Sequence, residues 1–134
     1  MKRFSLRLMI FSALACALFS LTALAQDFQR DFSLGSGGSI NIRNISGDVK
    51  VTGYDGQMVI VTGIKEGRNK ERVSIEDQSA GNSVDVRVRY PENCDNCNAS
   101  VRFEVKVPRN VAYRFNSISS VSGEVDVTDI SGEL

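Results

Sequence analysis

The sequence predicts an all-β fold, and three observations lead to this prediction. First, residues 121–129 (VSGEVDVTD) repeat residues 45–53 (ISGDVKVTG) almost residue for residue, and residues 130–134 (ISGEL) begin a third copy. Second, several other segments alternate strictly between apolar and polar residues, which is the pattern of a half-buried strand. Third, no segment after residue 25 shows helical periodicity. Because each repeat is too short to bury a face alone, we expect a β-solenoid-like stack of short strands.

Each copy of the repeat reads as a turn followed by a strand. A Ser-Gly pair supplies the turn, where Gly removes a steric cost, and an acidic residue then leads into alternating apolar and polar positions. The acidic residues are Asp48, Glu124 and Glu133. If the copies stack, these carboxylates form a ladder that binds a cation or sugar, or supplies an acid and a base for glycoside cleavage. We favour the simpler interpretation that each is a solvated residue beside a turn.

The first 25 residues have the order of a secretory signal peptide. Three basic residues precede an apolar run at 8–19, and small residues lead to Ala25, just before polar Gln26. We expect cleavage between Ala25 and Gln26, one domain at residues 26–134, and a location in the periplasm, at the cell surface or outside the cell. The alternatives are an uncleaved anchor and a lipoprotein acylated at Cys16, but the apolar run continues past that cysteine.

The composition argues against nucleic-acid binding and against a cofactor. Of 16 basic residues, Lys2, Arg3 and Arg7 leave with the signal, whereas all 16 acidic residues stay, so the net charge becomes about −3. The sequence has no His and no Trp, so histidine ligands are missing and stacking platforms are scarce. We therefore expect no cofactor, no resident metal and no nucleic-acid partner.

The elements before residue 80 follow from short local patterns. Alternation around Phe28 and Phe32 indicates a weak first strand, and the apolar run at 58–62 indicates a strand covered on both faces. The Asp55-Gly56 pair suits a hairpin turn. The remaining expected segments are a Gly-rich turn at 35–38, a strand at 39–42, a solvated charged loop at 65–72 and a strand at 73–75.

The clearest alternation predicts one antiparallel hairpin. Residues 84–90 and 101–107 each place apolar side chains on one face and charged side chains on the other. Pairing Tyr90 with Val101 satisfies both faces, because the inner pairs are then apolar and most outer pairs have opposite charges. The inner pairs in this register are Val88 with Phe103, Val86 with Val105, and Val84 with Val107. Pro108 ends the second strand, and residues 111–116 form another strand before the second repeat.

Cys94 and Cys97 lie in the loop of the expected hairpin. A redox pair would need a helix N-terminus to lower a thiol pKa, and no helical pattern follows the motif. A zinc site would need two further ligands from carboxylates or a second chain. A disulfide needs only export to an oxidising compartment, so we expect a disulfide, worth at most about 2 kcal/mol in the chain-entropy model.

From Phe32 to the end, the chain resembles a family of exported bacterial β-strand-repeat domains labelled as adhesins, whose role is uncharacterised. The resemblance rests on residues 37–42 (GGSINI), 44–55 (NISGDVKVTGYD), 105–108 (VKVP) and 121–125 (VSGEV). It implies a β-solenoid-like fold and a place outside the cytoplasm, and it carries no catalytic residues. Such domains usually continue through further Ser-Gly-acid repeats beyond the point where Leu134 stops this chain.

We expect a non-enzymatic envelope protein that displays a repeat surface to protein or glycan in an adhesin-like manner. The alternatives are a polysaccharide-acting β-helix enzyme with paired carboxylates and a structural domain of a larger envelope assembly. The last strands also predict an uncovered edge, because nothing follows to pack on Val125, Val127, Ile130 and Leu134. We therefore expect self-association through this C-terminal edge, or a chain that is the front part of a larger domain.

Overall fold

The computed structural model describes residues 27–134, apart from the side chain of Glu133, and this part of the chain is built from strands. The predicted signal peptide and its cleavage site at Ala25 and Gln26 lie outside the described residues. One short 3-10 helix, η1 (Lys70–Arg72), interrupts the strands. The strands are β1 (Phe28–Phe32), β2 (Ser39–Ser46), β3 (Val49–Tyr54), β4 (Val59–Glu66), β5 (Ser74–Asp77), β6 (Ser83–Arg89), β7 (Ser100–Pro108), β8 (Ala112–Ser122), β9 (Val125–Thr128) and β10 (Ser131–Glu133).

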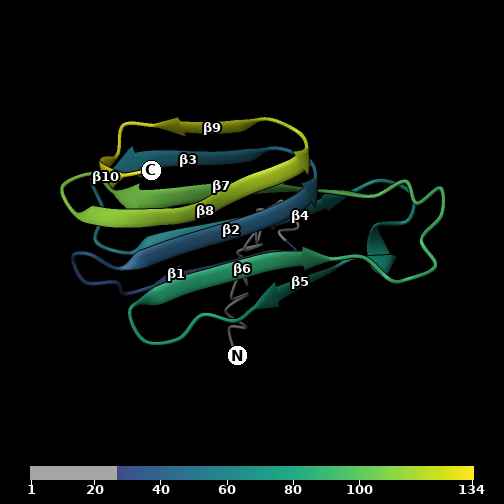
Figure 1. Ribbon diagram of the computed structural model, residues 1–134, viewed down its shortest axis with the longest axis horizontal. Helices are drawn as coiled ribbons and strands as arrows, with labels where there is room; N and C mark the ends of the chain where they lie inside the picture. Colours follow the sequence, from purple (N-terminus) through teal and green to yellow (C-terminus); the bar gives the residue numbers. More distant parts are fainter. Residues whose placement is uncertain (1–26) are drawn as a thin grey trace, which may run out of the picture.

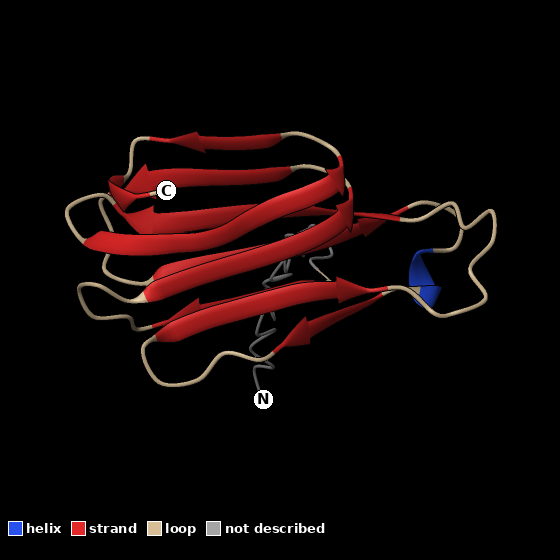
Figure 2. Cartoon of the chain, in the orientation of Figure 1, coloured by secondary structure: helices blue, strands red, loops and turns tan. Residues whose placement is uncertain are grey.

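The strands form two mixed sheets that lie face to face, as Figures 1 and 2 show. Sheet A has the strand order β1-β4-β7-β3-β9, and sheet B has the order β10-β8-β2-β6-β5. Sheet B faces the viewer in Figure 1, and β9 is the outermost strand at the top. The all-β class predicted from the sequence is confirmed.

One apolar core fills the space between the sheets. Alternate residues of the central strands point inward, among them Ile40 and Ile42 from sheet B and Val51 and Phe103 from sheet A, and each of these four is fully buried. Each such side chain contributes about 1.5–3 kcal/mol when it leaves water, so this shared core is what holds the sheets together. No helix in the described residues has the length and apolar character needed to cross a membrane.

The architecture is a pair of mixed sheets rather than the solenoid-like stack that the repeats predict. Part of the chain does run in parallel: β6, β2, β8 and β10 are parallel neighbours in sheet B, and β7, β3 and β9 are parallel neighbours in sheet A. However, β4 pairs antiparallel with both β1 and β7, and β5 pairs antiparallel with β6. The strands β1, β4 and β5 therefore have antiparallel neighbours only, and the repeat of turn and strand does not describe them.

The predicted hairpin between residues 84–90 and 101–107 is wrong. The first segment is β6 of sheet B, which pairs with β2 and β5, and the second is β7 of sheet A, which pairs with β4 and β3. Both strands do bury their valine faces in the shared core, but they do so from opposite sheets. Alternation reports only that one face is buried, so it cannot distinguish two strands of one sheet from two strands of opposite sheets. The Asp55-Gly56 turn likewise joins β3 to β4 without a hairpin, because β7 lies between them.

The run at 58–62 differs from its prediction in a smaller way. Val59 and Val61 are fully buried, whereas Met58, Ile60 and Thr62 are only half-buried. This segment, the start of β4, therefore has one inner face and one outer face, like its neighbours in sheet A.

The repeat places the same turn at the end of the sandwich where the chain crosses from sheet B to sheet A. Gly47 joins β2 to β3 with φ +117°, and Gly123 joins β8 to β9 with φ +156°. A Cβ on Gly47 would lie 2.1 Å from the Val101 carbonyl oxygen, and one on Gly123 would lie 2.1 Å from the Gly47 carbonyl oxygen. The turns thus stack backbone on backbone, which confirms that the Ser-Gly pairs require glycine.

Candidate functional site

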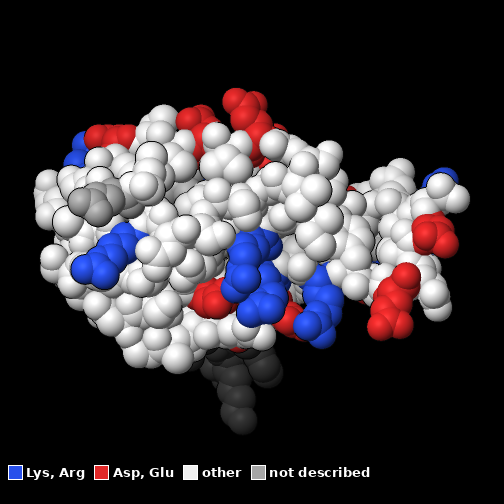
Figure 3. All heavy atoms as spheres, viewed as in Figure 1, with Lys and Arg blue, Asp and Glu red and all other residues white. Residues whose placement is uncertain are grey.

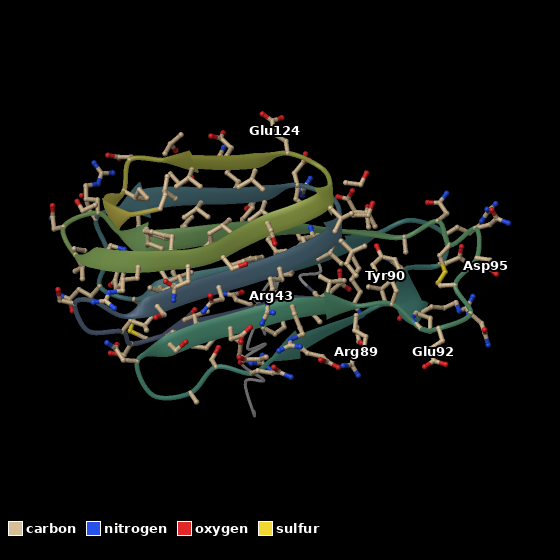
Figure 4. The ribbon with its side chains drawn as sticks, in the orientation of Figure 1. Arg43, Arg89, Tyr90, Glu92, Asp95 and Glu124 are labelled. Carbon is tan, nitrogen blue, oxygen red and sulfur yellow. A yellow bond between two sulfur atoms is a disulfide. The ribbon has the colours of Figure 1, made fainter. Side chains whose placement is uncertain are left out.

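The stacked turns bring two of the three predicted carboxylates together. Asp48 Oδ1 accepts a hydrogen bond from the backbone N–H of Glu124, at 2.9 Å. The Glu124 side chain points outward from the edge of the molecule (Figure 4). A small pocket of about 150 Å³ lies here, lined by Asp48, Val49, Lys50, Glu124 and Asp126. Asp48 therefore stabilises the next turn, and its carboxylate is already engaged by the backbone.

The third residue of the predicted ladder lies elsewhere. Glu133 belongs to β10, where its Cα is paired with that of Arg114 near the start of β8, whereas Glu124 follows the end of β8. Arg114 and Ser122 are eight positions apart along β8, a length of roughly 26 Å at the usual rise. In residues 27–134, no group of three or more His, Cys, Asp or Glu side chains is arranged to hold a metal ion.

Among the described strands, β9 is one of four edge strands, with β1, β5 and β10, and it is the candidate site because it carries the second copy of the repeat. It pairs with β3 in parallel, and the Val49 N–H donates to the Glu124 carbonyl at 2.9 Å. Hydrogen bonds of a parallel strand alternate between its two sides, so Asp126 and Thr128 face β3 while the N–H and C=O groups of Val125 and Val127 face away from it. We call this outward side of β9 the open edge.

A groove with both apolar and polar lining residues runs beside the open edge, and its polar residues are Asn116, Ser117 and Asp126. It has a volume of about 700 Å³ and opens between β8 of sheet B and β9 of sheet A. Its apolar lining comes from Phe115, Ile118, Val125, Val127 and Leu134. The side chain of Leu134 is 81% exposed and Val125 is 39% exposed, whereas the equivalent Val49 in β3 is 1% exposed because β8 and β9 cover it. The end of the core is thus open at this groove.

The outer face of sheet A carries an ordered row of charges that ends at the open edge. Asp126, Lys50 and Glu104 lie side by side on β9, β3 and β7, and all three are exposed. Opposite charges on neighbouring strands stabilise a sheet by a few tenths of a kcal/mol to about 1 kcal/mol per pair. Asp126 has such a partner on one side only, so the row favours a basic residue on any strand that is added.

The predicted disulfide lies in a second feature, which we call the finger (residues 67–72 and 91–99). The finger projects beyond the sheets at the right of Figure 1. Cys94 and Cys97 lie at disulfide-bonding distance, with their Cα atoms 5.1 Å apart. The two loops are joined by hydrogen bonds from Asn69 N–H to the Asn98 carbonyl at 2.8 Å, and from Asn98 N–H to Asn69 Oδ1 at 2.9 Å.

One buried polar residue was not foreseen. Asn44 is 3% exposed, and its Nδ2 donates to the carbonyl oxygens of Val101 at 2.6 Å and of Gly47 at 3.1 Å. Its Oδ1 accepts the Ile45 N–H at 2.9 Å. Asn44 precedes the Ser-Gly pair and secures the turn from inside, a role that the sequence signals only by placing a polar residue at an inward position of β2.

No protein-family model, curated protein or solved structure matches the chain. Its function must therefore be inferred from its own residues.

Proposed function

We propose that this chain is a non-catalytic binding domain of the bacterial cell envelope, which captures an extended segment of a protein partner along the open edge. The expected signal peptide and the family resemblance support the location. The single observation that carries the proposal is the open edge of β9 lying beside a groove that exposes Val125, Val127 and Leu134. Adding a strand to a sheet edge is a common mode of peptide recognition, in which main-chain hydrogen bonds give affinity and side-chain pockets give specificity.

The chain itself indicates which strand fits. β9 pairs with β3, in which Val49 and Val51 point inward on either side of the outward Lys50. A partner with the same apolar-basic-apolar order would place its apolar side chains in the groove and its basic residue next to Asp126. Four further hydrogen-bonding groups, the N–H and C=O of Val125 and Val127, would be satisfied at the same time.

A second copy of this chain fits the open edge less well. Pairing β9 with itself would bring Glu124 and Asp126 close to the acidic residues of the other copy. Like charges on adjacent strands are destabilising. Self-association through the C-terminal edge is therefore the weaker of the two uses of this surface, and the partner strand is the one we propose.

A peptide with the sequence of residues 45–53 (ISGDVKVTG) tests the proposal, because it copies the segment against which β9 already packs. We expect it to bind the protein recovered after export, and we expect the variant Val127→Pro to abolish binding. Proline lacks the N–H that would pair with the peptide, yet at this position it removes no hydrogen bond to β3.

The matched control is Thr128→Pro, whose lost N–H faces β3, so this variant should lower the unfolding temperature whereas Val127→Pro should not. Equal peptide binding by wild type and Val127→Pro would contradict strand addition. Light scattering without peptide checks the other occupant. A molar mass above that of the monomer for the wild type, but not for Val127→Pro, would show that a second copy occupies the edge.

The pocket at Asp48 and Glu124 keeps the carboxylate enzyme as the second candidate. Hydrolysis of an envelope polysaccharide that disappears in both Asp48→Asn and Glu124→Gln would favour this enzyme over the binding domain. The proposal predicts no turnover by the wild type, with Asp48→Asn affecting only stability through the Glu124 N–H.

A further inference from the structure

Three arginines lie close together on the outer face of sheet B, away from the open edge, and a fourth, Arg114, lies near the start of β8. Arg43 is on β2, and Arg87 and Arg89 are on β6. In Figure 3 basic atoms gather over β2 and β6, with acidic atoms beside them. Figure 4 shows Arg43 and Arg89 on this same face. This arginine face plays no part in the strand capture proposed above.

Two of the three arginines have a carboxylate partner. Arg43 Nη2 lies 3.2 Å from Asp85 Oδ1 and 3.3 Å from Asp85 Oδ2. Arg89 Nε lies 3.3 Å from Glu76 Oε1. The side chains of both ion pairs are partly exposed, so each ion pair is weak in water.

Arg87 differs from these two, because it makes no ion pair in the described part of the chain. Its Nη2 donates to the neutral Gln78 Oε1, and its Nε is fully covered without a hydrogen-bond partner. Its direct neighbour on β2 is Arg43, another cation, and its direct neighbour on β5 is Glu76, whose carboxylate pairs with Arg89. A half-buried cation beside a like charge loses hydration and gains repulsion, and an arriving anion relieves both.

The residues around the arginine pair have the chemistry of a saccharide surface. Two rows of neighbouring side chains cross the three strands β6, β2 and β8. One row is Arg87, Arg43 and Ser119, and the other is Asp85, Asn41 and Ser117, so hydroxyl and amide groups lie beside the arginine pair. Neighbouring strands are about 4.8 Å apart, which lets one oxyanion contact both guanidinium groups. These rows hold no aromatic side chain on which a nucleic-acid base would stack.

We propose that Arg43 and Arg87 form a binding site for an oxyanion carried on an extended polysaccharide, with Asn41, Ser117 and Ser119 contacting neighbouring sugar hydroxyls. Asp85 competes with the ligand for Arg43. The site would let the domain rest its flat face on an acidic glycan while the open edge holds a protein strand.

Titration calorimetry with polygalacturonate oligomers tests this proposal, with neutral dextran oligomers as the comparison. We expect polygalacturonate alone to bind, and Arg87→Gln to lower its affinity about tenfold, the usual size of a lost charge-assisted hydrogen bond. Arg102→Gln is the matched control, since Arg102 is 47% exposed, like Arg43 at 46%, but pairs with Glu66 on the other sheet. We expect this control to change the affinity less than twofold.

A variant that binds polygalacturonate more tightly distinguishes a change at the binding site from a loss of folding. Asp85→Asn frees Arg43 from its carboxylate, so we expect polygalacturonate to bind about threefold to tenfold more tightly, an effect that misfolding cannot produce. Equal losses in Arg87→Gln and Arg102→Gln, or equal binding of dextran, would overturn the proposal. Arg87-dependent binding to anionic phosphatidylglycerol vesicles, without binding to polygalacturonate, would contradict the glycan proposal. The ligand of the arginine pair would then be a lipid headgroup. Val127→Pro should leave polygalacturonate binding unchanged, so the failure of either proposal is distinguishable from that of the other.

Discussion

At the scale of single residues, the half-buried Tyr90 and the buried Tyr113 differ in whether their hydroxyl groups have a hydrogen-bond partner. Tyr90 donates its O–H to the Ala99 carbonyl at 2.8 Å, whereas the Tyr113 hydroxyl is buried without a partner. We therefore expect Tyr90→Phe to lower the free energy of unfolding by about 1 kcal/mol, and Tyr113→Phe to leave it unchanged or raise it slightly. Denaturant unfolding of both variants checks this. A larger loss for Tyr113→Phe than for Tyr90→Phe would mean that the Tyr113 hydroxyl does find a partner.

The same tyrosines predict the response to alkaline pH. Burial raises the pKa of Tyr90 and of Tyr113 above the ordinary value near 10. The protonated phenols are favoured in the folded state, so their contribution is fully present below pH 10 and is lost as the pH rises through the raised values. We expect unfolding temperatures to fall above pH 10, and to fall less steeply when both tyrosines are replaced by Phe. An identical alkaline slope in the double variant would contradict this assignment.

At the scale of the elements, the glycine turns are the part of the fold that the sequence specifies most directly. Gly37 and Gly47 both have positive φ, but a Cβ would meet nothing at Gly37 and would meet the Val101 carbonyl oxygen at Gly47. Gly37→Ala should therefore cost about 1 kcal/mol from backbone strain alone, and Gly47→Ala about 3 kcal/mol or more. Chemical denaturation gives both values. Similar costs at the two positions would show that the turns do not stack as closely as we describe.

The finger should depend on the Cys94–Cys97 link locally rather than globally. Reduction removes one short loop closure, and the Asn69 and Asn98 hydrogen bonds remain. We expect a small decrease in unfolding temperature and faster amide exchange confined to residues 91–99. Alkylation without reductant gives the native state of the pair, and two modified thiols in exported protein would contradict the predicted disulfide.

The strands and turns could be predicted from the sequence, but their partners could not. Alternation located β6 and β7 and their buried valines, and Gly47 and Gly123 marked the crossings between sheets. Pairing depends on which faces meet across the core, and a period of two residues carries no such information. The open edge was expected from the last repeat. The arginine pair was not, because Arg43 and Arg87 are 44 positions apart and become neighbours only through parallel pairing.

At the scale of the whole molecule, the proposed partner strand and the alternative occupant of the open edge, a second copy of the chain, should respond to salt in opposite ways. A basic partner strand is attracted by Asp126, so salt should weaken the binding of the 45–53 peptide. Self-association brings acidic residues together, so salt should strengthen it. Peptide titrations and sedimentation in low and high salt give the two trends. Stronger peptide binding at high salt would mean that the row ending at Asp126 has no part in recognition.

The central claim is that β9 offers the unpaired N–H groups of Val125 and Val127 to a partner strand. Residue-resolved hydrogen exchange tests this claim most directly. In the free protein we predict fast exchange at Val125 and Val127 and slow exchange at Asp126 and Thr128, whose N–H groups face β3. Adding the 45–53 peptide should slow exchange at Val125 and Val127 and leave Asp126 and Thr128 unchanged. Slow exchange at Val125 and Val127 in a monomeric protein without peptide would contradict the account, because the edge would then already be covered.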